Sequence, residues 1–192
     1  MCGRYYFASE QETPAMKKII EDIKKRYENT PELLSMKTGE IFPTEIVPVV
    51  TSKEPALMKW GFPRFDGKGQ VINARLETAD EKPMFRRAFN EMRCLVPANN
   101  YFEWEKIGSI KKKYAIGLHT PIYMAGFYRF DSAMQVPQFV ILTRPAAKEV
   151  EFIHDRMPVI LTDEMQYKWL NENIGTQDMI KFVPEELDYR DV

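Results

Sequence analysis

Between residues 47 and 143 the sequence alternates short segments rich in Val, Ile, Tyr and Phe with Pro and Gly residues. Segments of this composition are typical of β-strands, and the intervening Pro and Gly residues are typical of turns. We expect strands at 47–50, 57–62, 94–97, 101–106, 114–118, 123–128 and 139–143. Segment 108–113 is expected to be a hairpin turn, and its Lys111-Lys112-Lys113 run is expected to be solvated rather than to contact DNA. The pattern favours a mainly antiparallel sheet.

Helical patterns precede, interrupt and follow these strands. Thr13-Pro14 is expected to begin a helix, with Thr as the N-cap and Pro in the first turn. The apolar residues that recur at helical spacing after this start are Met16, Ile19, Ile20, Ile23 and Tyr27. We also expect short helices at 83–90 and 145–153, and a helix that covers 162–171.

The length of 192 residues suits one domain with a sizeable core and is too short for two ordinary domains. Strands followed by separate helices favour the α+β class. We therefore expect a single domain over 1–192, in which the chemistry-bearing part covers 2–161 and a C-terminal helix and tail cover 162–192. The tail after Gly175 is expected to be weakly structured.

Composition excludes several classes of protein. The two cysteines provide no disulfide framework, which suits a reducing cytosol. No Cys/His cluster has the spacing of zinc ligands, and no Walker-type loop or Gly-x-Gly-x-x-Gly motif occurs, so we expect neither a metal nor a cofactor. No segment has the pattern of a membrane span or a secretion signal. The net charge of −1 argues against a large basic surface but allows a local groove.

The second residue is a cysteine, in the sequence Met1-Cys2-Gly3-Arg4. Removal of Met1 would leave Cys2 with a free α-amine beside its thiol. Such an amine condenses with an aldehyde to an imine, and the thiol then closes on the imine carbon to give a five-membered thiazolidine. Closure is favoured because both groups belong to one residue. Most cysteines at this position have no such role, so the interpretation depends on the rest of the chain.

Two segments carry polar residues beside apolar ones. Asn73 and Arg75 follow two apolar residues and, being two apart, share one face if the strand continues; the alternative is a strand end with a turn-forming Asn. Glu103 lies among aromatic residues in segment 101–105, Tyr-Phe-Glu-Trp-Glu. Partial burial would raise the pKa of its carboxyl group and suit it to general acid–base catalysis, whereas the alternative is an exposed glutamate on an edge strand.

Two further features suggest proton transfer and base stacking. His154 lies in segment 153–158, Ile-His-Asp-Arg-Met-Pro, and imidazole titrates in the working pH range. The alternative is a structural histidine, which is what we expect of His119. Trp60-Gly61 could provide a stacking platform for an exposed base, although most tryptophans belong to the core.

These motifs occur in a defined order. They are Met-Cys-Gly-Arg at 1–4, Trp-Gly at 60–61, Asn-Ala-Arg-Leu-Glu-Thr at 73–78, Arg-Cys-Leu-Val-Pro-Ala at 93–98, Phe-Glu-Trp at 102–104, Ile-Leu-Thr at 141–143 and His-Asp-Arg-Met-Pro at 154–158. On this set, the chain from Cys2 to about Leu161 resembles the SOS-response-associated peptidase (SRAP) family, whose members shield abasic sites in single-stranded DNA. Each motif is weak alone, but the ordered set is specific.

The resemblance implies catalytic roles for five residues. After loss of the initiator methionine, Cys2 would form a thiazolidine cross-link with the ring-opened sugar aldehyde of an abasic site, and Asn73 would orient Cys2. Glu103 would manage protons during ring opening and imine formation. His154 would move protons near the deoxyribose and assist reversal, and Thr143 would line the same pocket.

The resemblance also implies a DNA-binding surface and a fold. The DNA-binding residues would be Arg4, Arg75 and Arg156 on the flanking phosphates, Trp60 with Gly61 against a neighbouring base, and Pro43 at the wall of the groove. Segment 39–44, Gly-Glu-Ile-Phe-Pro-Thr, departs from the usual family pattern at that wall. The family fold is an α+β arrangement of twisted sheets around a barrel-like centre.

Together these features predict covalent capture of abasic sites in single-stranded DNA, or at junctions of single and double strands, by lyase-like imine chemistry. We expect a monomer without cofactors in the cytoplasm, associated with the nucleoid and acting in the response to DNA damage. Two alternatives stay open. One is a cysteine autopeptidase that cleaves the Met1–Cys2 bond. The other is a non-covalent reader of modified bases.

Overall fold

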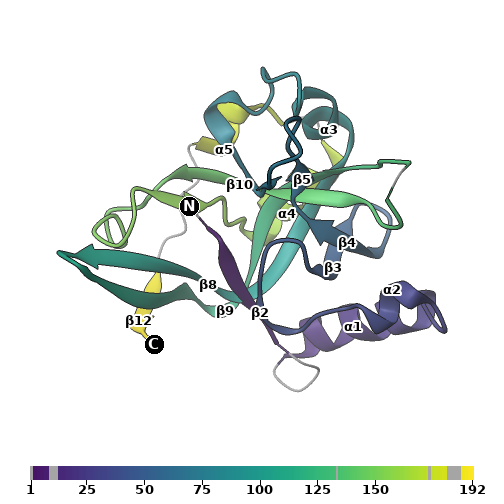
Figure 1. Ribbon diagram of the computed structural model, residues 1–192, viewed down its shortest axis with the longest axis horizontal. Helices are drawn as coiled ribbons and strands as arrows, with labels where there is room; N and C mark the ends of the chain where they lie inside the picture. The colour runs from purple at the N-terminus through teal and green to yellow at the C-terminus, as the bar shows by residue number, and fades with distance from the viewer. Residues whose placement is uncertain (1, 9–12, 133, 173, 181–186) are drawn as a thin grey trace.

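The computed structural model describes residues 2–8, 13–132, 134–172, 174–180 and 187–192. Five strands in it pair in a closed ring, and this ring is the barrel at the centre of the molecule (Figure 1). Around the ring they are β9 (Ile110–Arg129), β10 (Gln138–Pro145), β4 (Pro55–Trp60), β3 (Ile46–Thr51) and β8 (Arg93–Ile107), which pairs again with β9. Only β10 and β4 run parallel in this ring; the other neighbours are antiparallel.

Shorter strands extend the barrel wall. They are β1 (Arg4–Phe7) on β8, β2 (Gly39–Ile41) on β1, β7 (Asn73–Arg75) and β11 (Arg156–Pro158) on β10, and β12 (Asp188–Asp191) on β9, with β5 (Phe62–Pro63) and β6 (Gln70–Val71) paired separately. These contacts hold segments distant in sequence against the barrel. The prediction of a barrel-centred α+β fold is therefore confirmed.

Every predicted strand is present, but several boundaries differ. The predicted strands 94–97 and 101–106 are two halves of β8, with a register irregularity between Ala98 and Asn100. Likewise, 114–118 and 123–128 are both parts of β9. The predicted strand 57–62 is interrupted at Gly61, whose φ of +114° is a conformation that residues with a side chain rarely adopt.

The ends of β8 and β9 extend beyond the barrel as a two-stranded hairpin, at the left of Figure 1. Its tip is Gly108-Ser109, with Gly108 at a φ of +62°. The predicted turn over 108–113 was too long, because residues 110–113 belong to β9. No helix in the described parts of the chain combines the length and apolar character needed to cross a membrane.

Helices cover the barrel from outside (Figure 1). They are α1 (Pro14–Arg26), α2 (Pro31–Leu34), the 3₁₀ helix η1 (Leu76–Thr78), α3 (Arg86–Glu91), α4 (Asp163–Asn171) and α5 (Thr176–Ile180). The predicted start of α1 is confirmed, since the Thr13 side chain accepts a hydrogen bond from the Met16 N–H. Its predicted apolar face is also confirmed: Met16, Ile19, Ile20 and Ile23 are buried. The predicted helix at 83–90 is present as the shorter α3, and that at 162–171 as α4.

Two predictions about the C-terminal part were wrong. Residues 145–153 form no helix, because Pro145 ends β10 opposite Arg156 of β11 and residues 148–153 form turns. The tail after Gly175 is not wholly irregular. It contains α5 and the edge strand β12, which pairs with β9 over Tyr114–Gly117.

The N-terminal residues belong to the core. Cys2, Tyr5 and Phe7 are buried and join the same apolar cluster as Trp60 and barrel residues of β3, β4 and β10. A second cluster fills the space between the barrel and α3, α4 and α5. Because β1 is bound to the barrel wall in this way, the start of the chain is held at a defined place.

Candidate active site and DNA-binding surface

Cys2 is held by backbone pairing and by burial of its side chain. The β1 strand that follows it pairs with β8, with Arg4 opposite Phe102 and Tyr5 opposite Tyr101. The Cys2 thiol is buried, and its Sγ lies 3.8 Å from the backbone carbonyl oxygen of Arg4. Met1, whose removal the thiazolidine chemistry requires, lies outside the described residues.

Asn73 contacts Cys2 directly. Its side-chain Nδ2 donates a hydrogen bond of 2.8 Å to the carbonyl oxygen of Cys2. Strand β7 carries Asn73 and runs parallel to β10, with Asn73 opposite Ile141. Its Oδ1 is buried and has no hydrogen-bond partner among the described residues. The amide therefore holds the backbone of Cys2 and retains an unused acceptor.

Glu103 is a buried carboxylic acid beside the thiol. It lies on β8, only 4% of its surface is exposed, and it is paired with Tyr114 across the hairpin. Burial raises the pKa of the Cys2 thiol well above its usual value, and the nearby Glu103 carboxylate raises that pKa further. The same factors, burial first and then Cys2 and Glu103, raise the pKa of Tyr101. At neutral pH the Cys2 thiol is therefore protonated.

His154 faces the same cavity as Glu103. A cavity of about 510 Å³ is lined by both residues, by Gly3 next to Cys2, and by side chains of the hairpin. The imidazole Nδ1 accepts a hydrogen bond of 3.0 Å from the Arg156 N–H and lies 2.8 Å from the Asp155 carboxylate. Nδ1 accepts in the first contact when it carries no proton and donates in the second when it carries one, so both forms of this nitrogen have a partner.

Thr143 and Arg156 connect the segments that carry Asn73 and His154. Thr143 is buried, and its Oγ1 donates a 3.4 Å hydrogen bond to the carbonyl of Ala74. The Arg156 guanidinium forms two hydrogen bonds to the Glu77 carboxylate and donates a third, of 2.7 Å, to the Thr143 carbonyl. Only 12% of the Arg156 side chain is exposed. In this structure it joins η1 to β11, and its predicted phosphate contact stays a prediction.

The structure differs most from expectation at Trp60 and Gly61. Trp60 is fully buried, and its indole N–H donates to the Ile72 carbonyl at 3.0 Å, so it presents no face on which a base could stack. Gly61 has a positive φ, and a Cβ there would lie 3.0 Å from the Cβ of Gln70. Packing and backbone geometry therefore explain why Trp and Gly occur at these two positions, and the predicted DNA contacts of both residues stay untested.

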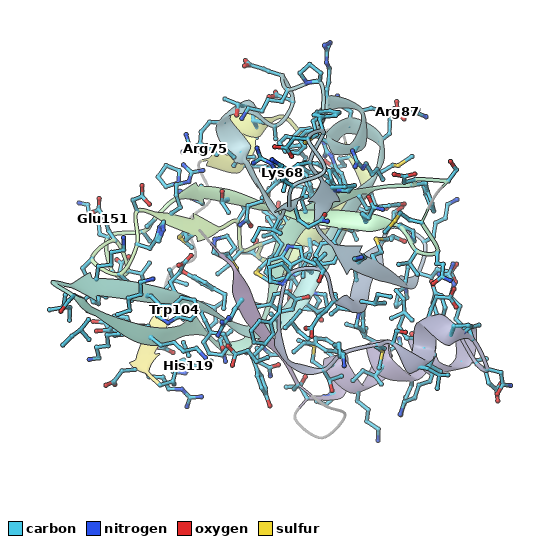
Figure 2. All side chains as sticks on the ribbon, in the orientation of Figure 1. Lys68, Arg75, Arg87, Trp104, His119 and Glu151 are labelled. Carbon is cyan, nitrogen blue, oxygen red and sulfur yellow. The ribbon has the colours of Figure 1, made fainter. Side chains whose placement is uncertain are left out.

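Trp104 is the tryptophan that borders the cavity. It lies on the hairpin, partly exposed, and the sequence prediction overlooked it (Figure 2). Strand alternation in segment 101–105 places Trp104 on the face opposite Glu103, and this pattern could have identified Trp104 as a candidate for base stacking. The Arg4 guanidinium lies 5.2 Å from the Trp104 ring centroid and 4.4 Å from that of Phe42. Pro43 adjoins Phe42 in the turn before β3.

Arg4 and Arg75 are carried by different strands, β1 and β7. Arg4 also contacts Glu40 at 3.1 Å, and 38% of its side chain is exposed. Arg75 is exposed at the end of β7 opposite Thr143. In Figures 1 and 2 the start of β1 lies between Arg75 and Trp104. Within the described residues, no cluster of His, Cys, Asp and Glu has the arrangement of a metal site.

Comparison with known proteins gives a consistent result. The abasic site processing protein YoqW of Bacillus subtilis is 33% identical over 129 residues, which cover 64% of this chain and 58% of the relative, less than two thirds of its length. The abasic site processing protein YedK of Escherichia coli is 29% identical over 187 residues, covering 93% and 83%. A crystal structure of a protein from Bacteroides thetaiotaomicron has a TM-score of 0.80 at 26% identity and covers the whole of this chain and 92% of its own.

The whole chain, residues 1–192, matches the family described as "SOS response associated peptidase (SRAP)". The match covers the barrel, the strands that hold Cys2 and Asn73, and the segments that carry Glu103 and His154. The chain therefore belongs to the SRAP family.

Proposed function

We propose that this protein processes abasic sites in DNA, and that it does so by covalent capture through Cys2. The hydrogen bond from Asn73 to the Cys2 carbonyl carries the proposal, because it holds Cys2 next to Gly3, which lines a cavity together with Glu103 and His154. The relatives named abasic site processing proteins support the same substrate. An abasic sugar in its ring-opened form provides the aldehyde that the chemistry needs.

The reaction begins at the α-amine that removal of Met1 exposes. The amine of Cys2 adds to the aldehyde carbon, and the resulting carbinolamine loses water to form an imine. The thiol of Cys2 then adds its sulfur to the imine carbon, and its proton ends on the ring nitrogen. The product is a thiazolidine, with one water released overall. Because burial and Glu103 keep the thiol protonated, the amine reacts before the sulfur does.

Proton transfer in these steps is assigned to the two titratable groups of the cavity. The Glu103 carboxylate, buried beside the thiol, takes the proton of the anomeric hydroxyl and returns it to the sugar ring oxygen as the ring opens; it then takes a proton from the amine that adds to the aldehyde and returns it to the hydroxyl that leaves as water. His154 is partly exposed at the same cavity and exchanges protons with solvent and with the deoxyribose. Thr143 would support β7, the strand that carries Asn73, through its bond to Ala74.

The DNA strand is bound through phosphate and base contacts at the mouth of the cavity. Arg4 of β1 and Arg75 of β7 would supply cations for the phosphates, and Arg156 would bind a phosphate if Glu77 released it. Trp104 provides the exposed ring on which a base can stack. Single strands are the preferred substrate, because the damaged sugar is reached without unstacking.

The test is a denaturing gel of processed protein mixed with single-stranded DNA that contains one abasic site. Intact mass first establishes that Met1 is absent. A shifted band that requires the abasic site and is lost in Cys2→Ala and in protein that retains Met1 supports covalent capture. If verified Met1-free protein gives no band, the proposal is wrong.

The description of the family as a peptidase and the proximity of Glu103 to the Cys2 thiol favour a second candidate, autoproteolysis of the Met1–Cys2 bond. Intact masses of Glu103→Ala and His154→Ala proteins separate the two. Autoproteolysis predicts retained Met1 in at least one variant. Removal by the host aminopeptidase predicts its loss in both.

A further inference from the structure

The hairpin of β8 and β9 has two chemically different faces. Cross-strand partners share a face and alternate residues change faces, so the pairs Trp104–Lys113 and Lys106–Lys111 lie on one side. We call this side, with Phe102, the basic–aromatic face. The pairs Glu103–Tyr114 and Glu105–Lys112 lie on the other side.

Protein side chains occupy the opposite face. Tyr114 donates a hydrogen bond of 2.8 Å to Glu105, and the ammonium group of Lys112 lies 3.3 Å from the Asp191 carboxylate. The rings of Phe152 and Tyr189 pack edge-on against Tyr114, with centroids 5.8 and 6.0 Å away. The polar and aromatic groups of this face are therefore already engaged within the protein.

The basic–aromatic face is different, because its cations exceed its anions. Neither Lys106 nor Lys111 forms an ion pair with any described residue, and both are exposed. Lys113 and Arg4 share a single carboxylate, that of Glu40, at 2.9 and 3.1 Å. The two free lysines, together with Lys113 and Arg4, thus place four positive charges beside the single negative charge of Glu40, on a protein whose net charge is −1.

Aromatic rings alternate with these cations. The Lys113 ammonium group lies 3.9 Å from the ring centroid of Phe102 and 5.9 Å from that of Trp104. Phe102 is buried, so the partly exposed Trp104 is the ring that a base can reach. Cations beside such a ring match the combination that single-stranded nucleic acids require, since the phosphates need positive charge and the unpaired bases need stacking partners.

The face is continuous with the candidate active site. The cavity of about 510 Å³ is lined by Gly3, Glu103 and His154 and also by Trp104, Lys106 and Lys111. A strand whose damaged sugar reached Cys2 would therefore leave the cavity along the hairpin. In Figure 2, Trp104 lies along the hairpin, between its tip and the barrel.

We propose that the basic–aromatic face of the hairpin binds the single strand on one side of the damaged nucleotide, with Lys106 and Lys111 on its phosphates and Trp104 under a base. This inference rests on the proposed function and extends it. It also reverses the expectation that Lys111-Lys112-Lys113 is only a solvated turn. Two of these lysines face the nucleic acid and the middle one does not.

The experiment compares Lys111→Gln with Lys112→Gln, which remove the same charge from adjacent positions on opposite faces. Binding of intact single-stranded DNA, which has no abasic site, is measured by fluorescence anisotropy over a range of salt concentrations. Lys111→Gln should weaken binding several-fold and lower the slope of log K against log salt by about 0.7. The double variant with Lys106→Gln should weaken it by about tenfold, whereas Lys112→Gln should stay within about twofold of the wild type.

A second arm measures cross-linking to abasic DNA extended only 5′ or only 3′ of the damage, and to an abasic trinucleotide. The Lys106→Gln/Lys111→Gln protein should capture one of the two extended substrates more slowly and the trinucleotide at the wild-type rate. Equal effects of Lys111→Gln and Lys112→Gln in anisotropy, or no effect of either, would overturn the hairpin proposal. Absence of any cross-link would overturn the proposed function instead, because the anisotropy arm does not depend on Cys2.

Discussion

The side-chain amide of Asn73 donates a 2.8 Å hydrogen bond to the backbone carbonyl of Cys2, which lies 71 residues earlier in the chain. Backbone pairing alone ends at Arg4, where β1 begins. The amide therefore extends the ordered structure to the residue whose amine and thiol are proposed to react. Orientation of these two groups depends on one side chain of β7.

Replacing Asn73 with Ala should slow cross-linking by about fivefold while leaving the protein folded. One hydrogen bond contributes about 1 kcal/mol, which corresponds to roughly that change in rate when the bond is needed for positioning. The rate is measured on denaturing gels with abasic single-stranded DNA. Asn90→Ala, at an exposed position of α3, is the matched control and should react like the wild type. An unchanged rate in Asn73→Ala would contradict the positioning role.

Removing the charge of Glu103 should make the Cys2 thiol more reactive. The Glu103 carboxylate adds to the effect of burial in raising the pKa of Cys2, so Glu103→Gln should lower that pKa and increase the thiolate fraction at a given pH. We expect several-fold faster alkylation of Cys2 by iodoacetamide, measured by peptide mass spectrometry. Cys94 is an internal control, because burial alone raises its pKa. Its rate should not change.

The ion pair between Glu77 and Arg156 should give the stability of the protein a pH dependence. The hydrogen bond from Arg156, opposed by partial burial, lowers the pKa of Glu77 in the folded state. Its contribution is therefore complete above the unfolded pKa of about 4.3 and is lost as the pH falls through the lower folded value. Because a third of the Glu77 side chain is exposed, we expect only about 1 kcal/mol.

Urea denaturation of the wild type and Glu77→Gln at a series of pH values measures this contribution. The wild type should be more stable at pH 7, and the difference in free energy of unfolding should disappear in the acid range. Cross-linking at neutral pH should also slow in Glu77→Gln, because the ion pair joins the segments that carry Asn73 and His154. A difference in stability that persists in acid would exclude the ion pair as its source.

Removing the Glu40 carboxylate should strengthen binding of single-stranded DNA. Burial opposes ionisation of Glu40, but hydrogen bonds from Lys113 and Arg4 outweigh it and hold its pKa below the usual value, so it is charged at neutral pH. Glu40→Gln releases both cations, and we expect about threefold tighter binding at low salt and little change at high salt. Glu28→Gln, an exposed change of equal charge after α1, should have little effect in the same anisotropy measurement.

Arg93 should be important for stability rather than for chemistry. Its buried guanidinium donates to the carbonyls of Phe89, Glu172 and Ile174, each at 2.9 Å, and burial lowers its pKa to about 10. Arg93→Met would leave these carbonyls without their donor and should lower the free energy of unfolding by about 3 kcal/mol. Arg87→Met removes a guanidinium whose side chain is 81% exposed and should cost under about 0.5 kcal/mol. A loss below about 1 kcal/mol for Arg93→Met would refute this role.

Local patterns were sufficient for the elements that depend on local interactions. The start of α1 follows from the Thr13 side chain and the N–H of Met16, three residues later, and its buried face follows from helical spacing. The extent of α4 and the positions of the barrel strands were likewise predictable. Segment 145–153 was not: Pro145 pairs with Arg156, and the backbone hydrogen bonds that follow, such as that from the Glu151 N–H to the Ala147 carbonyl, close turns that do not continue as a helix.

The spatial arrangement of the site residues, in contrast, was not predictable from local patterns. Cys2, Asn73, Glu103 and His154 were identified from their chemistry and from the resemblance of their motifs, but nothing local indicates that Asn73 holds the carbonyl of Cys2. That contact exists because β7 and β1 bind different parts of one barrel wall.

Long-range packing also determined which tryptophan side chain is buried and which is exposed. Trp60 and Trp104 both lie beside residues suited to DNA contact, yet the closed barrel buries Trp60 against Tyr5 and Phe139, while the hairpin carries Trp104 out to the cavity. Period-two alternation assigns each side chain to one face of a strand, but which face meets solvent depends on partners far away in the chain. Local sequence thus predicted the strands and the reactive groups, and barrel closure determined which groups meet and which surface stays exposed beside the cavity.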